Sequence, residues 1–168
     1  MGNISGRVGG VLGGYSIQAD VDDDKVTGRI GGILFGSDIN LDYSQKQGYI
    51  SGRIGGGFIG RDVDGTLSSD SLSARIGGAI DGNDLYLEKR DSAIYGRCGG
   101  EAIGFDVNVV FSCGNASGRL GGDMIGMDVE ASVYDVDPLI AAALFAITYY
   151  MYKINQRNNH NSGSSGSN

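Results

Sequence analysis

Apolar and polar residues alternate along most of this chain. The segments Ile17–Asp22 and Ile39–Tyr43 each switch between an apolar and a polar residue at every step. A period of two places the apolar side chains of a β-strand on one face and the polar side chains on the other. The pattern therefore predicts a chain built mostly of half-buried strands.

A short phrase around an arginine returns six times. Each arginine follows a small residue and precedes an apolar residue and two glycines, and another glycine follows seven positions after it. The interval between arginines is 22 residues, with one interval of 24. The arginines are Arg7, Arg29, Arg53, Arg75, Arg97 and Arg119. A fixed period of this kind indicates six copies of one structural unit.

Each unit is expected to be a β-hairpin. In the first unit, Gly14-Tyr15 fits a two-residue type II′ turn, whose first position has a positive φ and favours glycine. A turn at this place predicts a register in which Leu12 lies opposite Ile17. The same rule predicts the pairs Ile80 with Leu85 and Met124 with Val129. Six hairpins make twelve strands.

An apolar helix is expected after the last strand. Asp137 is a good N-cap, and Pro138 suits the first helical turn. The 14 residues Leu139–Tyr152 are apolar on all sides except for Thr148 and the tyrosine hydroxyl groups. This run is shorter than the roughly 20 residues that cross a bilayer. Glycines such as Gly6 on the inward face of the strands also indicate that another backbone or a helix comes close. The helix is therefore expected inside a barrel.

These patterns predict a mainly β protein: a closed antiparallel barrel of about twelve strands, formed by six hairpin repeats of about 22 residues, around a C-terminal apolar helix. The domain is expected to span residues 1–154, with its central helix at 138–154, followed by a disordered polar tail at 155–168. A β-solenoid is the alternative fold. Parallel coils would stack the six arginines about 4.8 Å apart, which is an unfavourable ladder of like charges.

Composition narrows the classes of function. The 168 residues suit one domain, and 13 basic against 20 acidic residues give a net charge of -7, which argues against a nucleic-acid partner or a general attraction to anionic membranes. Two cysteines, Cys98 and Cys113, and a start without a signal-peptide pattern favour a cytoplasmic protein. The single histidine, His160, lies in the polar tail, so no histidine-based catalytic triad or metal cluster is expected. The chain is therefore not expected to be an enzyme.

One repeat suggests an anion site. The predicted register sets Arg75 opposite Arg90, and like charges facing each other across a sheet are destabilising unless an anion joins them. Arginine and lysine suit phosphate or lipid-headgroup recognition. The candidate headgroup-binding residues are Arg75, Lys89, Arg90 and Arg97. The alternative is neutralisation by Glu88 and Asp91. The row of six repeated arginines could form an anion-binding stripe, but it is interpreted as a set of surface ion pairs with acids on neighbouring strands, for which the candidates are Asp20, Asp22, Asp42 and Glu88.

An acidic cluster between the first two repeats is a candidate calcium site. Its residues are Asp20, Asp22, Asp23 and Asp24. Ca²⁺ prefers several carboxylate oxygens. The alternative interpretation is an acidic turn beside Lys25.

Twelve antiparallel strands followed by an apolar helix that opens at DPLIAAALFAITYYMYKI resemble the tubby-like superfamily, which includes LURP-one-related proteins and phospholipid scramblases. The resemblance is one of architecture and covers residues 1 to about 154. It implies a twelve-stranded barrel around a central helix, peripheral membrane association through phospholipid or phosphoinositide headgroups, a scramblase-like role in lipid movement, or an unknown binding role. The partners expected for the chain are membrane phospholipid headgroups or, alternatively, a protein. The expected function is a non-enzymatic binding or scaffold module. The alternative is a structural, self-assembling β-repeat protein without a ligand.

Overall fold

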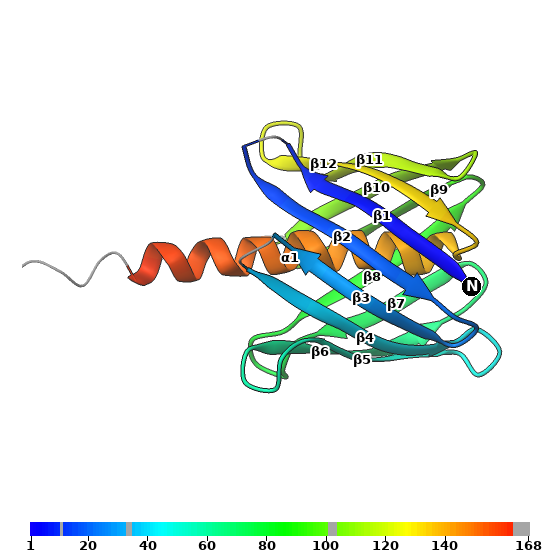
Figure 1. Ribbon diagram of the computed structural model, residues 1–168, viewed down its shortest axis with the longest axis horizontal. Helices are drawn as coiled ribbons and strands as arrows, with labels where there is room; N and C mark the ends of the chain where they lie inside the picture. Colours follow the sequence, from blue (N-terminus) through cyan, green and yellow to red (C-terminus); the bar gives the residue numbers. More distant parts are fainter. Residues whose placement is uncertain (11, 33–34, 101–103, 163–168) are drawn as a thin grey trace, which may run out of the picture.

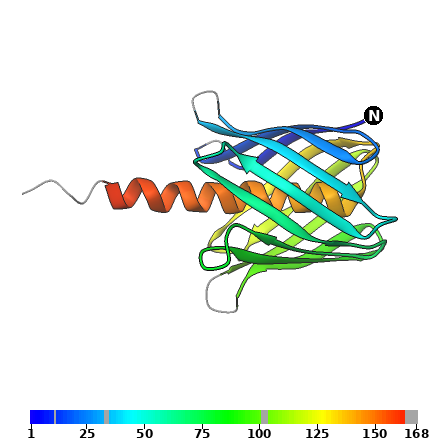
Figure 2. The same ribbon diagram turned by 90° about the horizontal axis from the view of Figure 1, so that it is seen from below.

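The computed structural model describes residues 1–10, 12–32, 35–100 and 104–162 (Figure 1). Its strands form one closed antiparallel barrel, in which each strand pairs with the next along the chain and β1 pairs with β12. The helix α1 runs along the barrel axis, as two perpendicular views show (Figures 1 and 2). The predicted fold class is confirmed.

The element bounds are as follows: β1 (Gly2–Gly9), β2 (Gly14–Val21), β3 (Lys25–Gly31), β4 (Gly36–Ser44), β5 (Tyr49–Gly55), β6 (Gly60–Leu67), β7 (Ser71–Ile76), β8 (Asn83–Arg90), β9 (Ala93–Gly99), β10 (Gly104–Ser112), β11 (Asn115–Gly121), β12 (Gly126–Tyr134) and α1 (Pro138–Ser162).

The core lies between the inward face of the barrel and the helix. On β1, Ile4 and Val8 are buried and the intervening Ser5 is exposed, as a period of two requires. The helix is buried continuously from Leu139 to Met151. The buried polar side chain of Thr148 is satisfied within the helix, because its hydroxyl donates a hydrogen bond of 2.7 Å to the Leu144 carbonyl.

The predicted hairpin register is wrong, although the predicted faces are right. Gly9 pairs with Gly14, and residues 10–13 form the connecting loop in place of a two-residue turn at Gly14-Tyr15. Gly9 and Gly14 have φ of 119° and 121°, a conformation that favours glycine and closes the ladder there. The register differs by six residues, an even number, so each strand residue keeps its predicted face. Leu12 therefore lies in a loop, not opposite Ile17.

Close packing of neighbouring strands explains the glycine before five of the six repeated arginines. A Cβ at Gly28 would collide with the carbonyl oxygen of Gln18 on the adjacent strand β2. At Gly28 the residue opposite, on β2, is Ala19. In the fourth unit alanine and glycine are exchanged: Ala74 precedes the arginine, and Gly65 lies opposite it on β6. The backbone that comes close at Gly28 is thus a neighbouring strand rather than the helix.

The helix is longer than predicted. It begins at Pro138, where the Asp137 carboxylate accepts a hydrogen bond of 2.8 Å from the Leu139 amide, but it continues past Ile154 to Ser162. Residues 155–162 are thus helical, contrary to the expected disorder, and the remainder of the predicted tail, 163–168, lies outside the described residues. Among the described residues no helix is long and apolar enough to span a membrane.

Candidate functional site

The two ends of the barrel differ in chemistry. We call the end from which α1 emerges the loop end; it carries the connections 10–13, 32–35, 56–59, 77–82, 100–103 and 122–125 (Figure 1). The connections at the opposite end, which we call the turn end, carry seven aspartates and one lysine. These aspartates are Asp22, Asp23, Asp24, Asp70, Asp91, Asp135 and Asp137.

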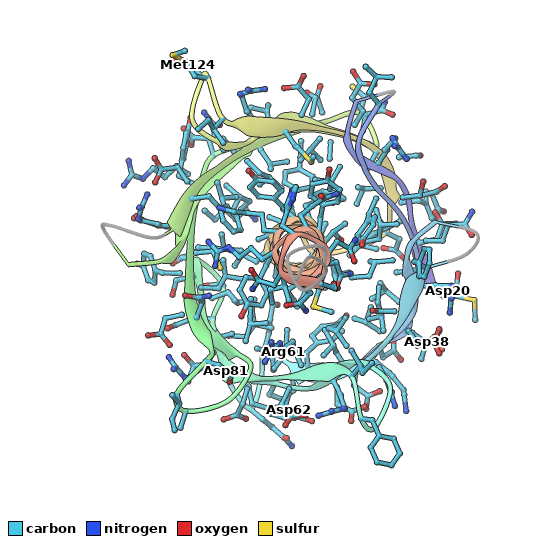
Figure 3. The ribbon with its side chains drawn as sticks, turned by 90° about the vertical axis from the view of Figure 1, so that its left-hand side faces the viewer. Asp20, Asp38, Arg61, Asp62, Asp81 and Met124 are labelled. Atoms are coloured by element: carbon cyan, nitrogen blue, oxygen red, sulfur yellow. The ribbon has the colours of Figure 1, made fainter. Side chains whose placement is uncertain are left out.

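Large apolar side chains are exposed at the loop end. Seven of them, at least 78% exposed, come from five of the six loops, and 101–103 of the remaining loop lies outside the described residues. We call them the apolar crown: Leu12, Phe35, Phe58, Ile59, Ile80, Met124 and Ile125. Figure 3 looks onto this end, with Met124 on the rim and the helix at the centre.

The repeated arginines hold the loops in place. In five units the arginine Nη1 donates a hydrogen bond to the aspartate nine residues later, at 2.5–2.8 Å. The Nε of Arg75 also donates to the Gly78 carbonyl at 3.3 Å, so the guanidinium ties the start of the loop to the following strand. In the first unit Ser16 replaces the aspartate, and Arg7 donates to its hydroxyl at 3.4 Å. The predicted ion pairing of the arginines is thus confirmed, but with different partners from those predicted.

The structure does not assemble the predicted headgroup patch. Arg75 lies opposite Asp84, whereas Arg90 lies opposite Ala93 at the other end of β8. Six residues of strand separate Asp84 from Arg90, which corresponds to about 20 Å. Arg90 donates instead to Glu88 at 3.0 Å, and this hydrogen bond raises the pKa of the Arg90 guanidinium. The six-residue difference in register is the reason that Arg75 and Arg90 do not face each other.

The remaining two residues of the predicted headgroup patch, Lys89 and Arg97, each lie beside other residues in the barrel wall. Arg97 donates a hydrogen bond of 2.6 Å to Asp106. Lys89 lies opposite Ile94 in the ladder between β8 and β9. Headgroup binding by these residues stays a prediction, now without the clustered charge that motivated it.

The predicted calcium ligands do not form a common site. Asp20 lies within β2, opposite Thr27, while Asp22 exchanges backbone hydrogen bonds with Lys25 across the turn. Within the described residues, which include all four of these aspartates, no three His, Cys, Asp or Glu side chains are grouped to hold a metal ion. The alternative interpretation, an acidic turn beside Lys25, agrees with this arrangement.

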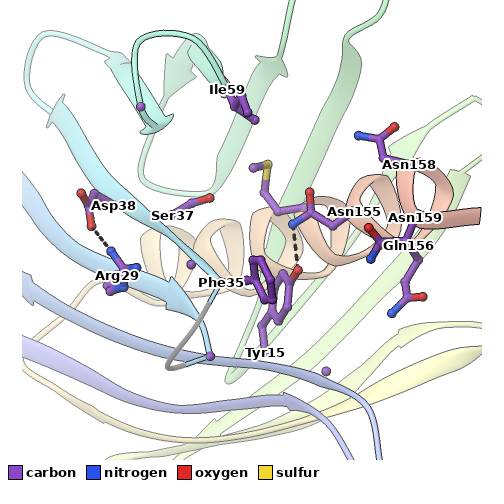
Figure 4. A pocket seen from close by; sticks show the side chains of 15 residues that line it. Tyr15, Arg29, Phe35, Ser37, Asp38, Ile59, Asn155, Gln156, Asn158 and Asn159 are labelled. Atoms are coloured by element: carbon purple, nitrogen blue, oxygen red, sulfur yellow. Dashed lines mark hydrogen bonds and ion pairs between the residues drawn. The ribbon is translucent and has the colours of Figure 1, made fainter. Parts of the chain in front are cut away.

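A groove opens beside the emerging helix. Its volume is about 850 Å³, and it lies between α1 and the loops that join β3 to β4 and β5 to β6 (Figure 4). Phe35, Ile59 and Met151 supply apolar lining, whereas several amide side chains of the helix supply polar lining. Asn155 donates a hydrogen bond of 2.7 Å to the Tyr15 hydroxyl, which positions the helix relative to β2.

The helix closes the opposite side of the barrel mouth. It packs more closely against β8 than against β4, β5 and β6. On this closed side the Lys153 ammonium lies 5.4 Å from the centre of the Tyr149 ring and 5.5 Å from that of Phe105. Burial, followed by the charge of Arg157, lowers the pKa of Lys153. The groove lies away from β8, beside β2, β3 and β4 and the loop 56–59.

The chemistry of this end is suited to binding. Carboxamide groups both donate and accept hydrogen bonds, and the described lining of the groove contains no histidine or cysteine. Cys98 is buried on the closed side, where burial raises the pKa of its thiol to about 12. It is therefore protonated near neutral pH and a poor nucleophile.

The sequence contains a signal for the crown that the predicted hairpins did not use. In three of the loops that carry the crown an isoleucine comes within two residues of the closing glycine: Ile59, Ile80 and Ile125. A strict two-residue turn assigns these apolar residues to strands. Four-residue loops flanked by glycines would instead have placed them at the tips.

No protein-family model matches this sequence, and the comparisons with curated proteins and with solved structures found no similar protein. The resemblance to the tubby-like superfamily therefore stays a prediction from architecture.

Proposed function

We propose that this protein is a non-enzymatic binding module that docks a protein partner at its loop end. The observation that carries the proposal is the apolar crown, with seven large apolar side chains almost fully exposed at one end of the molecule. Large apolar surface collected on one part of a protein is typical of an interaction site. The turn end, in contrast, is acidic.

The loops that carry the crown are held in place before binding. Each guanidinium bonded to a carboxylate and to loop carbonyls restricts its loop, as Arg119 does with Asp128 and with the carbonyls of Gly122 and Asp123. A surface that is ordered in advance loses less conformational entropy on binding. The repeated ion pairs therefore favour a docking role for the loop end.

A protein fits this end better than a flat lipid bilayer does. The last eight residues of α1, Asn155–Ser162, which we call the helix extension, project beyond the loops (Figures 1 and 2). They extend for about 12 Å. A bilayer that touched the crown would have to bury this segment, including Arg157 and several amides, at a large cost in free energy. A protein partner can provide a hollow for it.

Site-specific photocrosslinking tests the proposal. A benzophenone amino acid replaces Phe58 in the crown or, as a matched control, the exposed Ser69 at the turn end. After irradiation in cells that make the protein, we expect a discrete protein adduct from position 58 and none from position 69. Equal adducts from both positions, or none from position 58, would overturn the proposal.

Vesicle flotation tests the membrane alternative that the resemblance implies. The purified chain is mixed with vesicles of phosphatidylcholine, with and without phosphatidylserine. We expect it to stay at the bottom of the gradient with both compositions. Flotation that is lost in a Phe58→Ser variant would show that the crown binds lipid, and would overturn the choice of a protein partner.

A further inference from the structure

The groove has the dimensions of a short helix. It follows α1 from Met151 to Asn159, a length of about 12 Å. A helical segment of that length and about 10 Å across occupies roughly 900 Å³, close to the groove volume of about 850 Å³. The helix extension of this same chain is eight residues long and projects from the mouth of the groove. Its length matches the groove.

We propose that the partner at the loop end is a second copy of this chain, with the helix extension of each copy lying in the groove of the other. The inference rests on the proposed docking function and names the partner. The two helices would run antiparallel beside each other, and the same patch would be used on both copies, as in a two-fold symmetric interface. One contact would occupy both grooves.

The side chains that face the groove are self-complementary. Met151, Asn155, Asn158 and Asn159 lie along one side of the helix, at helical spacing, and all line the groove. Asparagine amides both donate and accept hydrogen bonds, so the same row of asparagines on a second copy can satisfy the hydrogen-bonding groups of the first. The cations Lys153 and Arg157 line a different, small cavity on the closed side. They would not oppose their counterparts across the helix pair.

The distribution of charge favours contact through the loop ends. With a net charge of -7, two copies repel each other in general. The aspartates of the connections, however, are concentrated at the turn end. The connections there carry seven aspartates, whereas the described residues of the loop-end connections carry two, Asp81 and Asp123. Of those two, Asp81 forms an ion pair with Arg61 (Figure 3). Two loop ends can therefore meet with little repulsion.

The same approach covers the apolar crown. In the paired arrangement the exposed rings of Phe58 and Phe35 and the other crown residues of one copy face those of the second copy. Removing apolar surface from water stabilises such a complex. The helix extension, the groove and the crown thus have one common explanation.

Sedimentation equilibrium of the purified full chain tests this inference. We expect a monomer–dimer equilibrium for the unchanged protein. Asn158→Glu places a carboxylate among the groove-facing residues of each copy, where the two charges would repel each other. It should raise the dimer dissociation constant at least tenfold. Asn161→Glu is the matched control, because Asn161 is on the same helix extension but not among the groove-lining residues, and it should leave the constant within about twofold. Phe58→Ser should also weaken the dimer.

Three other outcomes would overturn the inference. A monomer at every concentration would do so, as would a dimer that Asn158→Glu and Phe58→Ser leave unchanged, provided that thermal unfolding shows both variants to be folded. A monomeric chain whose crosslinker at position 58 captures a different protein would overturn the second copy as partner and leave the proposed docking function intact. A crosslinked adduct of twice the chain mass, formed by the purified protein, would support both.

Discussion

Arg75 lies opposite Asp84 in the ladder between β7 and β8, and its Nη1 donates a hydrogen bond of 2.8 Å to the Asp84 carboxylate. The same guanidinium donates to the carbonyls of Gly78, Ala79 and Gly82 in the loop between them. One side chain thus joins the end of a strand, its loop and the start of the next strand. Four further units repeat the ion pair.

The loop carbonyls, more than the ion pair, should account for what Arg75 contributes to stability. Asp84→Asn removes an exposed ion pair, which typically stabilises a protein by about 0–1 kcal/mol. Arg75→Ala removes several hydrogen bonds as well, each contributing about 1 kcal/mol, and should lower the free energy of unfolding by about 1–3 kcal/mol. Urea unfolding of both variants measures the difference. Equal losses would show that the carboxylate is the dominant partner.

A charge in the buried part of the helix should prevent folding. Leu144 and Phe145 are 1% and 0% exposed, in agreement with the predicted central helix. An unpaired carboxylate there costs far more than lost packing, so we expect Leu144→Asp to abolish the folded state in circular dichroism. Asn161→Asp, in the exposed helix extension, is the control and should change the free energy of unfolding by less than about 0.5 kcal/mol. A folded Leu144→Asp variant would contradict the helix-filled barrel.

Glycine is required only where strands come close. A methyl group at Gly28 would collide with the Gln18 carbonyl, whereas nothing lies within 4 Å of the corresponding position at Gly10. We expect Gly28→Ala to destabilise the protein by about 2 kcal/mol or more. Gly10→Ala should be neutral or stabilise it by up to about 1 kcal/mol, because alanine reduces the freedom of the unfolded chain. Thermal unfolding of the pair measures this, and equal effects would refute the explanation.

Stability should fall at high pH because of Cys98. Burial raises the pKa of this thiol from 9.0 to about 12. A group whose pKa is raised on folding contributes stability that is complete below the unfolded pKa and is lost as pH rises toward the folded value. The loss should therefore begin near pH 9, at up to about 1.4 kcal/mol per pH unit. Urea unfolding at pH 7 and pH 10 should show a smaller loss for Cys98→Ala than for the unchanged protein.

Thiol labelling provides a direct check on the same residue. Cys113 is exposed and Cys98 is buried. At pH 8 an alkylating reagent should modify Cys113 quickly and Cys98 only after denaturant is added. Mass spectrometry counts the labels. Two labels on the native protein at similar rates would contradict the buried position of Cys98.

The sequence by itself determined the strand number, the faces of the strands and the central helix. Alternation with a period of two assigns Ile4 and Val8 to one face whichever residues they pair with. A predominantly apolar run with no polar face, such as Leu139–Met151, has no favourable place in water. These features depend on local pattern and burial, and the structure confirms them.

Only the tertiary structure decided the register and the site. The ladder closes at Gly9 and Gly14; the glycines of the sequence permit this loop and a two-residue turn at Gly14 alike, and the structure decides between them. The same six-residue difference gives Arg75 an aspartate in place of Arg90 and puts Leu12 in the crown. The groove exists because α1 packs toward β8 and away from β5, and no pattern along the chain encodes the position of a helix across a barrel.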